Sequence, residues 1–262
     1  MKNVGLLLVS CLPLFAFSQT DFTVASGAQR TLSATERTLS LKTMSLGDNC
    51  VIIIPPSLDG WTVTATDASI GIGVKIIGQG IKGSSGSAGA SSSSAGNCMY
   101  GVNGGPGGNG SNGAFGKSVS LNLRIRKIGS LLINVTGGSA GNGGAGGAGG
   151  KGGNATCSCN AGTGGSGGNG GRAGSGGNGG NVTISYSAIG NTVISNSHFT
   201  IENAGGAAGA SGAAGIGGAG GAGITCPDQK SAARLPGKSG SPGLAGNKGL
   251  PGSKGVTTLQ SK

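Results

Sequence analysis

Short runs of β-branched and alternating residues predict three β-rich stretches along the chain. The first, residues 22–78, is punctuated by turn signals such as Gly47-Asp48 and Asp59-Gly60. The second is clearer, because apolar and polar side chains alternate strictly over residues 119–125, as in a half-buried strand. After a turn, residues 131–135 return as a second strand. The strands expected in the first stretch are residues 39–41, 51–54, 61–63 and 74–77.

The third β-rich stretch lies towards the carboxyl end of the chain. Residues 182–186 are expected to pair with residues 193–201 across a turn at 189–191. A last short strand over residues 256–259 closes the chain.

Between these stretches lie three glycine-rich runs with a regular phase. From Gly138 to Gly153 every third residue is glycine, and a second phase beginning at Gly137 is also glycine apart from Ala140. The register resumes from Gly162 to Gly180. A period of three is typical of polyproline II, which has three residues per turn and no internal hydrogen bonds. A face of glycine lets a neighbouring segment approach closely, so that backbone groups pair between segments.

The number of glycine faces predicts where each segment lies. The segments that contain Gly80–Gly89 and Gly237–Gly255 have one glycine face, which is expected of an edge position. Residues 137–180 have two glycine faces, and residues 205–223 have two faces of small residues. We therefore expect a bundle with the second run inside, and with the first outgoing and last returning segments at its edges.

The predicted fold class is β plus polyglycine II. A small β-rich base, solenoid or sandwich-like, carries three out-and-back glycine-rich hairpins that pack as a six-helix bundle. Collagen is the competing interpretation, encouraged by proline before glycine at Pro236, Pro242 and Pro251, but collagen does not carry Gly-Gly-x triplets. Flexible disorder is the other alternative. The expected domains are a signal peptide at 1–18, a β-rich base at 19–78, a bundle at 79–255 interleaved with base segments 118–136 and 181–203, and a terminal strand at 256–262.

Composition and the first residues bear on the core and the compartment. Glycine makes up 62 of 262 residues and aromatic residues 3%, so one conventional core is not expected. Lys2, the apolar run over residues 4–17 and the triplet Ala16-Phe17-Ser18 fit a secretory signal peptide. The run is too short to span a bilayer, and a lipobox-like match before Cys11 is the alternative. We expect a protein that is secreted or held at the cell surface, without membrane insertion after cleavage.

The charge balance favours an anionic or polar surface partner. The formal net charge is +11, which suits a cell-surface polysaccharide or receptor. Nucleic acid is not expected as a partner, because the basic residues are scattered rather than clustered with aromatic ones.

Four of the six cysteines fall at the midpoints of the glycine-rich runs. Cys98 lies at the first midpoint, Cys157 and Cys159 flank the second, and Cys226 lies near the third. We expect two disulfides that join Cys98 and Cys226 to the Cys157/Cys159 pair, with the partners left open. Cys50 would be a lone thiol in the base. A metal or redox pair at Cys157 and Cys159 is disfavoured, because no histidine is near and the C-x-x-C spacing is absent.

Catalytic residues are not expected. The one histidine, His198, lies in a predicted strand, and no pair of carboxylates or Ser/His/Asp set falls on one feature. We predict that the protein is not an enzyme and that it needs no cofactor or metal.

The Gly-Gly-x runs, such as Gly143-Gly144-Ala145-Gly146-Gly147-Ala148, resemble polyglycine-II sandwich proteins. The pattern is similar to the distal tip adhesins of T-even-like phage long tail fibres, and more distantly to snow flea antifreeze proteins. The adhesin resemblance implies that loops at the distal end recognise a bacterial surface receptor. The corresponding tip loops here are residues 97–100, 154–160 and 225–230. The candidate binding residues are Asn97, Met99, Tyr100, Asn154, Thr156, Ser158, Asn160, Thr225, Asp228, Gln229 and Lys230.

The expected function is that of a secreted or cell-surface adhesin, with its β-rich base available for attachment to a larger fibre or surface assembly. A predicted signal peptide departs from phage adhesins and suggests a cell that uses a related scaffold at its own surface. One alternative is an ice-binding protein, with one flat face made by Ser139, Asn142, Ala145, Ala148, Thr163, Ser166 and Asn169, interrupted by Lys151 and Arg172. The other is an inert structural element of a wall or matrix.

Overall fold

The β-rich part of the chain forms two parallel sheets. The computed structural model describes residues 21–227 and 233–262, so the predicted signal peptide at 1–18 lies outside the described residues. One sheet has six strands in the order β1-β3-β5-β7-β9-β13, and the other has five in the order β10-β8-β6-β4-β2. The strands of the first sheet are β1 (Asp21–Val24), β3 (Thr38–Leu46), β5 (Gly60–Ile70), β7 (Ser118–Ile128), β9 (Val182–Ala188) and β13 (Thr257–Ser261). The strands of the second sheet are β2 (Gln29–Thr31), β4 (Val51–Ile53), β6 (Val74–Ile77), β8 (Leu131–Asn134) and β10 (Phe199–Glu202).

Consecutive strands alternate between the two sheets, so the chain winds as a solenoid. Every pairing within these two sheets is parallel, and each strand pairs with strands of the coils before and after it. Two sequence-based pairings are therefore wrong. Residues 131–135 do not pair with 119–125, and β10 does not pair with β9. The turn at Gly129 and Ser130 carries the chain into the other sheet, where β8 finds partners in β6 and β10.

The β-rich part has one conventional core, so the expectation from composition is wrong for this part of the chain. The core lies between the two sheets and is built from stacked apolar side chains. Leu39, Val63, Leu121 and Ile184 occupy equivalent positions in four neighbouring strands, and all are buried. In the second sheet Ile52, Ile76 and Ile133 stack in the same way. In the six-stranded sheet these side chains alternate with outward polar ones such as Ser120 and Asn122, which explains the period of two in the sequence, because successive side chains in a strand point to opposite faces. A shift of one residue in the pairing would turn these apolar side chains towards solvent, so burial of the core fixes the register of the strands.

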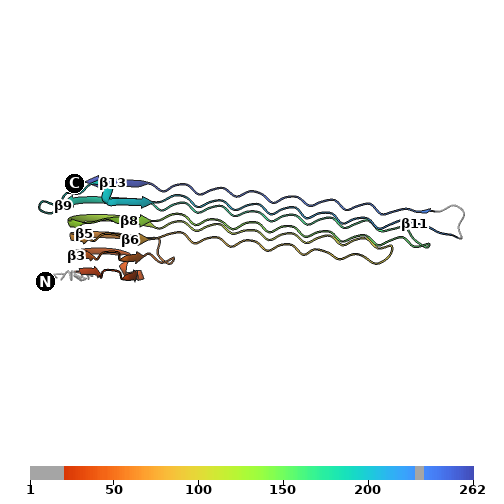
Figure 1. The fold of residues 1–262 in the computed structure, drawn as a ribbon, viewed down its shortest axis with the longest axis horizontal. Helices are drawn as coiled ribbons and strands as arrows, with labels where there is room; N and C mark the ends of the chain where they lie inside the picture. The colour runs from red at the N-terminus through yellow and green to blue at the C-terminus, as the bar shows by residue number, and fades with distance from the viewer. Residues whose placement is uncertain (1–20, 228–232) are drawn as a thin grey trace, which may run out of the picture.

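Three long excursions leave the solenoid at the same corner. The chain passes from the five-stranded to the six-stranded sheet through six residues at 54–59, but through residues 78–117, 135–181 and 203–256 in the later coils. Figure 1 shows these excursions running far beyond the sheets as extended segments that lie side by side. A short ribbon of β11 (Ile224–Thr225) and β12 (Ala233–Arg234) lies at the far end of the third excursion. The remaining elements are two 3₁₀ turns, η1 (Ala34–Glu36) and η2 (Asn196–His198), and no helix among the described residues has the length and apolar character to cross a membrane.

Each excursion has an outgoing and a returning leg, and we number the legs in chain order. Legs 1 and 2 are residues 79–96 and 100–117, legs 3 and 4 are residues 136–155 and 160–181, and legs 5 and 6 are residues 203–223 and 236–256.

The legs are joined by backbone hydrogen bonds at every third residue. The N–H groups of Gly80, Gly83 and Gly86 in leg 1 donate to the carbonyls of Thr136, Ser139 and Asn142 in leg 3, each at 2.8 Å. Leg 3 donates in the same way to leg 5. On the other side of the bundle, leg 2 donates to leg 4, and leg 4 donates to leg 6. A second set of bonds joins each leg to the one before it in the chain.

The legs therefore form two layers, which continue the two sheets. Legs 1, 3 and 5 follow β6, β8 and β10 of the five-stranded sheet, whereas legs 2, 4 and 6 lead into β7, β9 and β13 of the six-stranded sheet. Within the described residues, legs 3 and 4 each bond to four other legs, and legs 1 and 6 each bond to two. The second excursion thus lies between the first and the third.

Candidate functional site

Two disulfides join the ends of the three excursions. Cys98 is bonded to Cys159, and Cys157 is bonded to Cys226, with Cα–Cα distances of 6.0 and 5.7 Å. The prediction that Cys98 and Cys226 bond to the Cys157/Cys159 pair is confirmed, and the structure decides the partners that the sequence left open. Cys50 is buried in the solenoid core and forms no disulfide with any described cysteine. Burial raises the pKa of its thiol, so this cysteine is held in its neutral form.

The first tip loop presents two apolar side chains. Cys98 has a left-handed backbone, with φ of 63°, and its N–H donates to the carbonyl of Asn154 at 2.9 Å. Next to it, Met99 and Tyr100 are 63% and 75% exposed. Asn97 is also exposed. The disulfide and the bond to the second loop hold this loop in place, while the side chains of Met99 and Tyr100 stay exposed.

The second tip loop is a tight turn with hydrogen bonds of its own. The backbones of Thr156 and Cys159 bond to each other at 3.1 and 3.2 Å, and the hydroxyls of Thr156 and Ser158 lie 2.8 Å apart. The side-chain oxygen of Asn154 accepts from the N–H of Ala222 at 3.0 Å. Thr156, Ser158 and Asn154 are therefore partly occupied in shaping the loop, whereas the side chain of Asn160 is exposed.

The third tip loop is described only in part. Thr225 is exposed in β11, but Asp228, Gln229 and Lys230 lie outside the described residues. Arg234 in β12 donates through Nε and a terminal nitrogen to the carbonyl of Cys157 at 3.2 and 2.9 Å. It thus anchors the third loop to the second.

Sequence reasoning missed further apolar side chains near the tip. Val102 and Leu235 are each 66% exposed, and Ile224 is 43% exposed. The sequence carried a signal for this exposure, because a large apolar residue inside a glycine-rich run has no core in which to be buried.

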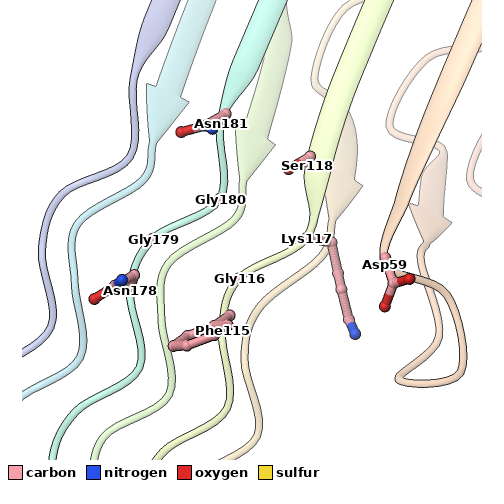
Figure 2. Close-up of a pocket in the computed structure, with 9 residues that line it drawn as sticks. All are labelled: Asp59, Phe115, Gly116, Lys117, Ser118, Asn178, Gly179, Gly180 and Asn181. Carbon is pink, nitrogen blue, oxygen red and sulfur yellow. The ribbon is translucent and has the colours of Figure 1, made fainter.

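Sequence reasoning also missed a hollow where the legs meet the solenoid. Figure 2 shows it between the loop that carries Asp59 and the ends of legs 2 and 4, with Phe115, Asn178 and Asn181 around it. Its volume is about 350 Å³, and a neighbouring hollow of about 410 Å³ shares Asp59, Ser118 and Asn181 with it. The two hollows adjoin at these three residues, and we call them together the junction groove.

The histidine and the acidic residues do not gather into a site. The Nδ1 atom of His198 accepts from the N–H of Ser195 at 3.1 Å, within its own turn. Over residues 21–227 and 233–262, no group of three or more His, Cys, Asp or Glu side chains is placed to hold a metal ion.

The single flat face proposed for ice binding is wrong. Ser139, Asn142, Ala145 and Ala148 belong to leg 3, whereas Thr163, Ser166 and Asn169 belong to leg 4. These legs lie in different layers, because leg 3 bonds sideways to legs 1 and 5 and leg 4 to legs 2 and 6. The two sets therefore contribute to separate surfaces, with Lys151 on the first and Arg172 on the second.

Comparison with known proteins adds little to this geometry. No protein family model matches the chain, and no curated protein is similar to it in sequence. Among solved structures, a springtail antifreeze protein from Granisotoma rainieri, described as a nine polyproline type II helical bundle, is 26% identical. The alignment covers 63% of this chain and 92% of that one, with a TM-score of 0.15, which is too low to support an argument.

Proposed function

We propose that the protein is a secreted or cell-surface recognition protein, which presents its disulfide-linked tip loops on a polyglycine-II bundle. The observation that carries this proposal is the tip itself. Two disulfides bring three loops together at the end of long legs, and Met99 and Tyr100 are 63% and 75% exposed there. Exposed apolar side chains on a rigid support are typical of binding surfaces, because little entropy is lost when they are covered.

The polyglycine-II assignment of the legs is supported by their hydrogen bonds. Bonds at every third residue agree with a helix of three residues per turn, because each turn then presents the same face to the same neighbour. Far-ultraviolet circular dichroism that shows a polyproline-II signature tests this assignment. A spectrum without that component would contradict it.

The proposed partner is a cell-surface receptor or polysaccharide. The net charge of +11 supports attraction to anionic surfaces, and two disulfides agree with an oxidising environment outside the cell. The solenoid lies at the opposite end from the tip, which leaves it available for attachment to a larger assembly (Figure 1). The proposal assigns no catalytic step to any residue.

A cell-binding assay tests recognition by the tip. Labelled protein is incubated with a panel of bacterial cells and compared with the variant Met99→Ser/Tyr100→Ser, which keeps all four tip cysteines. Loss of two exposed anchors is expected to weaken binding at least about tenfold.

The matched control is Val193→Ser, which removes an apolar side chain that is 82% exposed in the connection between β9 and β10. This variant is expected to bind like the unaltered protein. Equal binding by the tip variant and the unaltered protein would refute recognition by Met99 and Tyr100.

Ice binding is a second candidate, favoured by the layer of legs 1, 3 and 5. Its outward positions carry mostly small residues, and Ser85 and Asn142 accept hydrogen bonds from the backbone N–H of Asn142 and Ala210 at 3.2 and 2.9 Å. These bonds hold the outward side chains flat against the layer. Lys82 and Lys151 interrupt it. A thermal hysteresis measurement that shows no effect on ice growth would eliminate this candidate.

A further inference from the structure

The junction groove combines an aromatic ring, two amides and a carboxylate on a floor of glycine. Phe115 ends the outward row of leg 2, and its side chain is 67% exposed. Gly116, Gly179 and Gly180 lie between the larger residues, so that the backbone forms the floor of the groove. Figure 2 shows Phe115 and Asn178 at one end, and Ser118 and Asn181 at the other. The two ends are one turn of the legs apart, about 9 Å for polyproline II.

The two asparagine amides have one defined orientation. The side-chain oxygen of Asn178 accepts from the N–H of Ser253 at 2.9 Å, and that of Asn181 accepts from the N–H of Val256 at 2.8 Å. Because their oxygens are occupied by leg 6, each amide keeps its two N–H donors for another partner. Among the described residues, neither NH₂ group donates a hydrogen bond to another protein group. The groove therefore offers oriented donors.

The acceptor in the groove is Asp59. Its carboxylate is 87% exposed and lies 3.6 Å from the guanidinium of Arg37. The N–H of Ser118 donates to the Asp59 carbonyl at 3.1 Å, and the ammonium group of Lys117 donates to the carbonyl of Pro56 at 2.9 Å. The backbone of the loop that carries Asp59 is thus bonded to the end of leg 2 and to the start of β7, which holds this loop at the edge of the groove.

An exposed aromatic ring beside oriented donors and a carboxylate matches the surface of a sugar. One face of a pyranose ring presents C–H groups, which suit the negative face of the Phe115 ring. Its hydroxyls can donate to the carboxylate of Asp59 and accept from the two amides, and they can do either with the hydroxyl of Ser118. The volumes of the two hollows, about 350 and 410 Å³, fall at the lower end of the range for small-ligand sites. Arg37 and Asp59 offset each other's charge, and Lys117 is engaged with Pro56, so no cluster of free cations selects an acidic sugar.

We propose that the junction groove is a second binding site, for a neutral saccharide unit of a surface polysaccharide. Phe115 stacks on the sugar ring, the amides of Asn178 and Asn181 donate to its oxygens, and Asp59 accepts from its hydroxyls. The site lies at the opposite end of the legs from the tip loops, so it binds independently of them.

The test uses the full chain on an array of oligosaccharides. The array carries neutral hexose and N-acetylhexosamine oligomers beside uronic-acid and sialylated ones, and a bound neutral oligomer is then titrated calorimetrically. Phe115→Ala is expected to weaken binding about tenfold, through loss of the stacking surface. Asn178→Ala is expected to weaken it about fivefold, through loss of the hydrogen bonds from its amide.

Two variants control for folding and for general surface changes. Asn169→Ala removes an amide whose oxygen accepts from the N–H of Leu244 at 2.9 Å, the same contact that Asn178 makes, but away from the groove. Leu250→Ala removes an apolar side chain that is 72% exposed. Both are expected to keep the affinity of the unaltered protein.

Three outcomes would overturn the proposal. They are no binding of any neutral oligomer, unchanged affinity in Phe115→Ala, and binding restricted to acidic oligomers. The variant Met99→Ser/Tyr100→Ser separates this site from the proposed tip function, because it is expected to bind the neutral oligomer normally. If this folded variant loses saccharide binding, the groove is not the site.

Discussion

Glycine at every third position of a leg lies where the neighbouring leg leaves no space for a side chain. A Cβ atom added to Gly168 of leg 4 would collide with the carbonyl oxygen of Gly105 in leg 2. The N–H of Gly168 meanwhile donates to the carbonyl of Gly147 in leg 3 at 2.8 Å. Gly168 is thus packed against leg 2 on one side and bonded to leg 3 on another, and this close packing excludes every larger residue.

Replacing an inner glycine is expected to destabilise the protein. In Gly168→Ala the methyl group pushes legs 2 and 4 apart, an overpacking cost of about 1–3 kcal/mol. Denaturant unfolding measures the change, and Ser166→Ala, an outward position on the same leg, is the control. If both variants unfold at the same denaturant concentration, the close-approach argument for Gly168 is wrong.

The carboxyl group of Glu36 makes the stability of the solenoid depend on pH in the acidic range. Burial alone would raise the pKa of its carboxyl group. The carboxylate, however, accepts hydrogen bonds from the N–H and the hydroxyl of Ser33, at 2.8 and 2.9 Å, and from Arg30. These bonds outweigh burial and lower the pKa of Glu36 below its ordinary value of 4.5. Because the unfolded chain binds this proton more readily, the stabilisation is present above pH 4.5 and is lost as the pH falls through the folded-state pKa.

The variant Glu36→Gln is expected to lack this part of the acid response. Its free energy of unfolding should fall less steeply below pH 4.5 than that of the unaltered protein. Urea unfolding at a series of pH values measures both slopes. Parallel slopes would show that the Ser33 and Arg30 contacts do not favour the charged form.

At the scale of elements, the legs depend on the solenoid for their order. Each leg continues directly from a strand or into one, and the strand order β6-β8-β10 becomes the leg order 1-3-5. At the far end the legs have no such frame, and there the disulfides Cys98–Cys159 and Cys157–Cys226 join different excursions through cysteines that are 61 and 69 residues apart in sequence. Both ends of the legs are therefore held, by strands at one and by covalent bonds at the other.

Removing the second disulfide is expected to loosen the tip. The double variant Cys157→Ser/Cys226→Ser should lose about 2–4 kcal/mol of stability, because the unfolded chain is freed from a long closed loop. Amide hydrogen exchange should accelerate at Gly152 and Gly153 while Ile133 in β8 stays protected. Equal acceleration at Ile133 would mean that the tip and the solenoid unfold as one unit.

As a whole, the molecule is a long slab rather than a sphere, as Figure 1 shows. A leg of some 20 residues spans about 62 Å in polyproline II, and the longest strands add about 36 Å. This places the tip far from the solenoid, which agrees with the proposed recognition by the tip loops.

Small-angle X-ray scattering tests this shape. A rod of these dimensions has a radius of gyration of about 29 Å, whereas a compact chain of this length has one of about 18 Å. A measured value close to that of a compact chain would contradict extended legs.

The sequence by itself determined what depends on a residue and its neighbours along the chain. The alternation around Leu121 predicted a strand and its buried face, and the glycine phases marked legs 1 and 6 as edges and legs 3 and 4 as inner, the order in which backbone hydrogen bonds join them. The phases carry this information because a side chain on a given face excludes a neighbour there, whatever that neighbour is. The cysteines at the turning points likewise predicted which ends are joined.

Only the tertiary structure decided which elements meet. Backbone N–H and C=O groups are chemically alike in every strand, so nothing in residues 131–135 could tell that they pair with β6 and β10 rather than with the preceding strand. The same holds for the partners of Cys157 and Cys159, and for the separation of Ser139 and Thr163 into two layers. The junction groove is a further case, since Asp59 and Asn178 are distant in sequence and meet only because the coils stack.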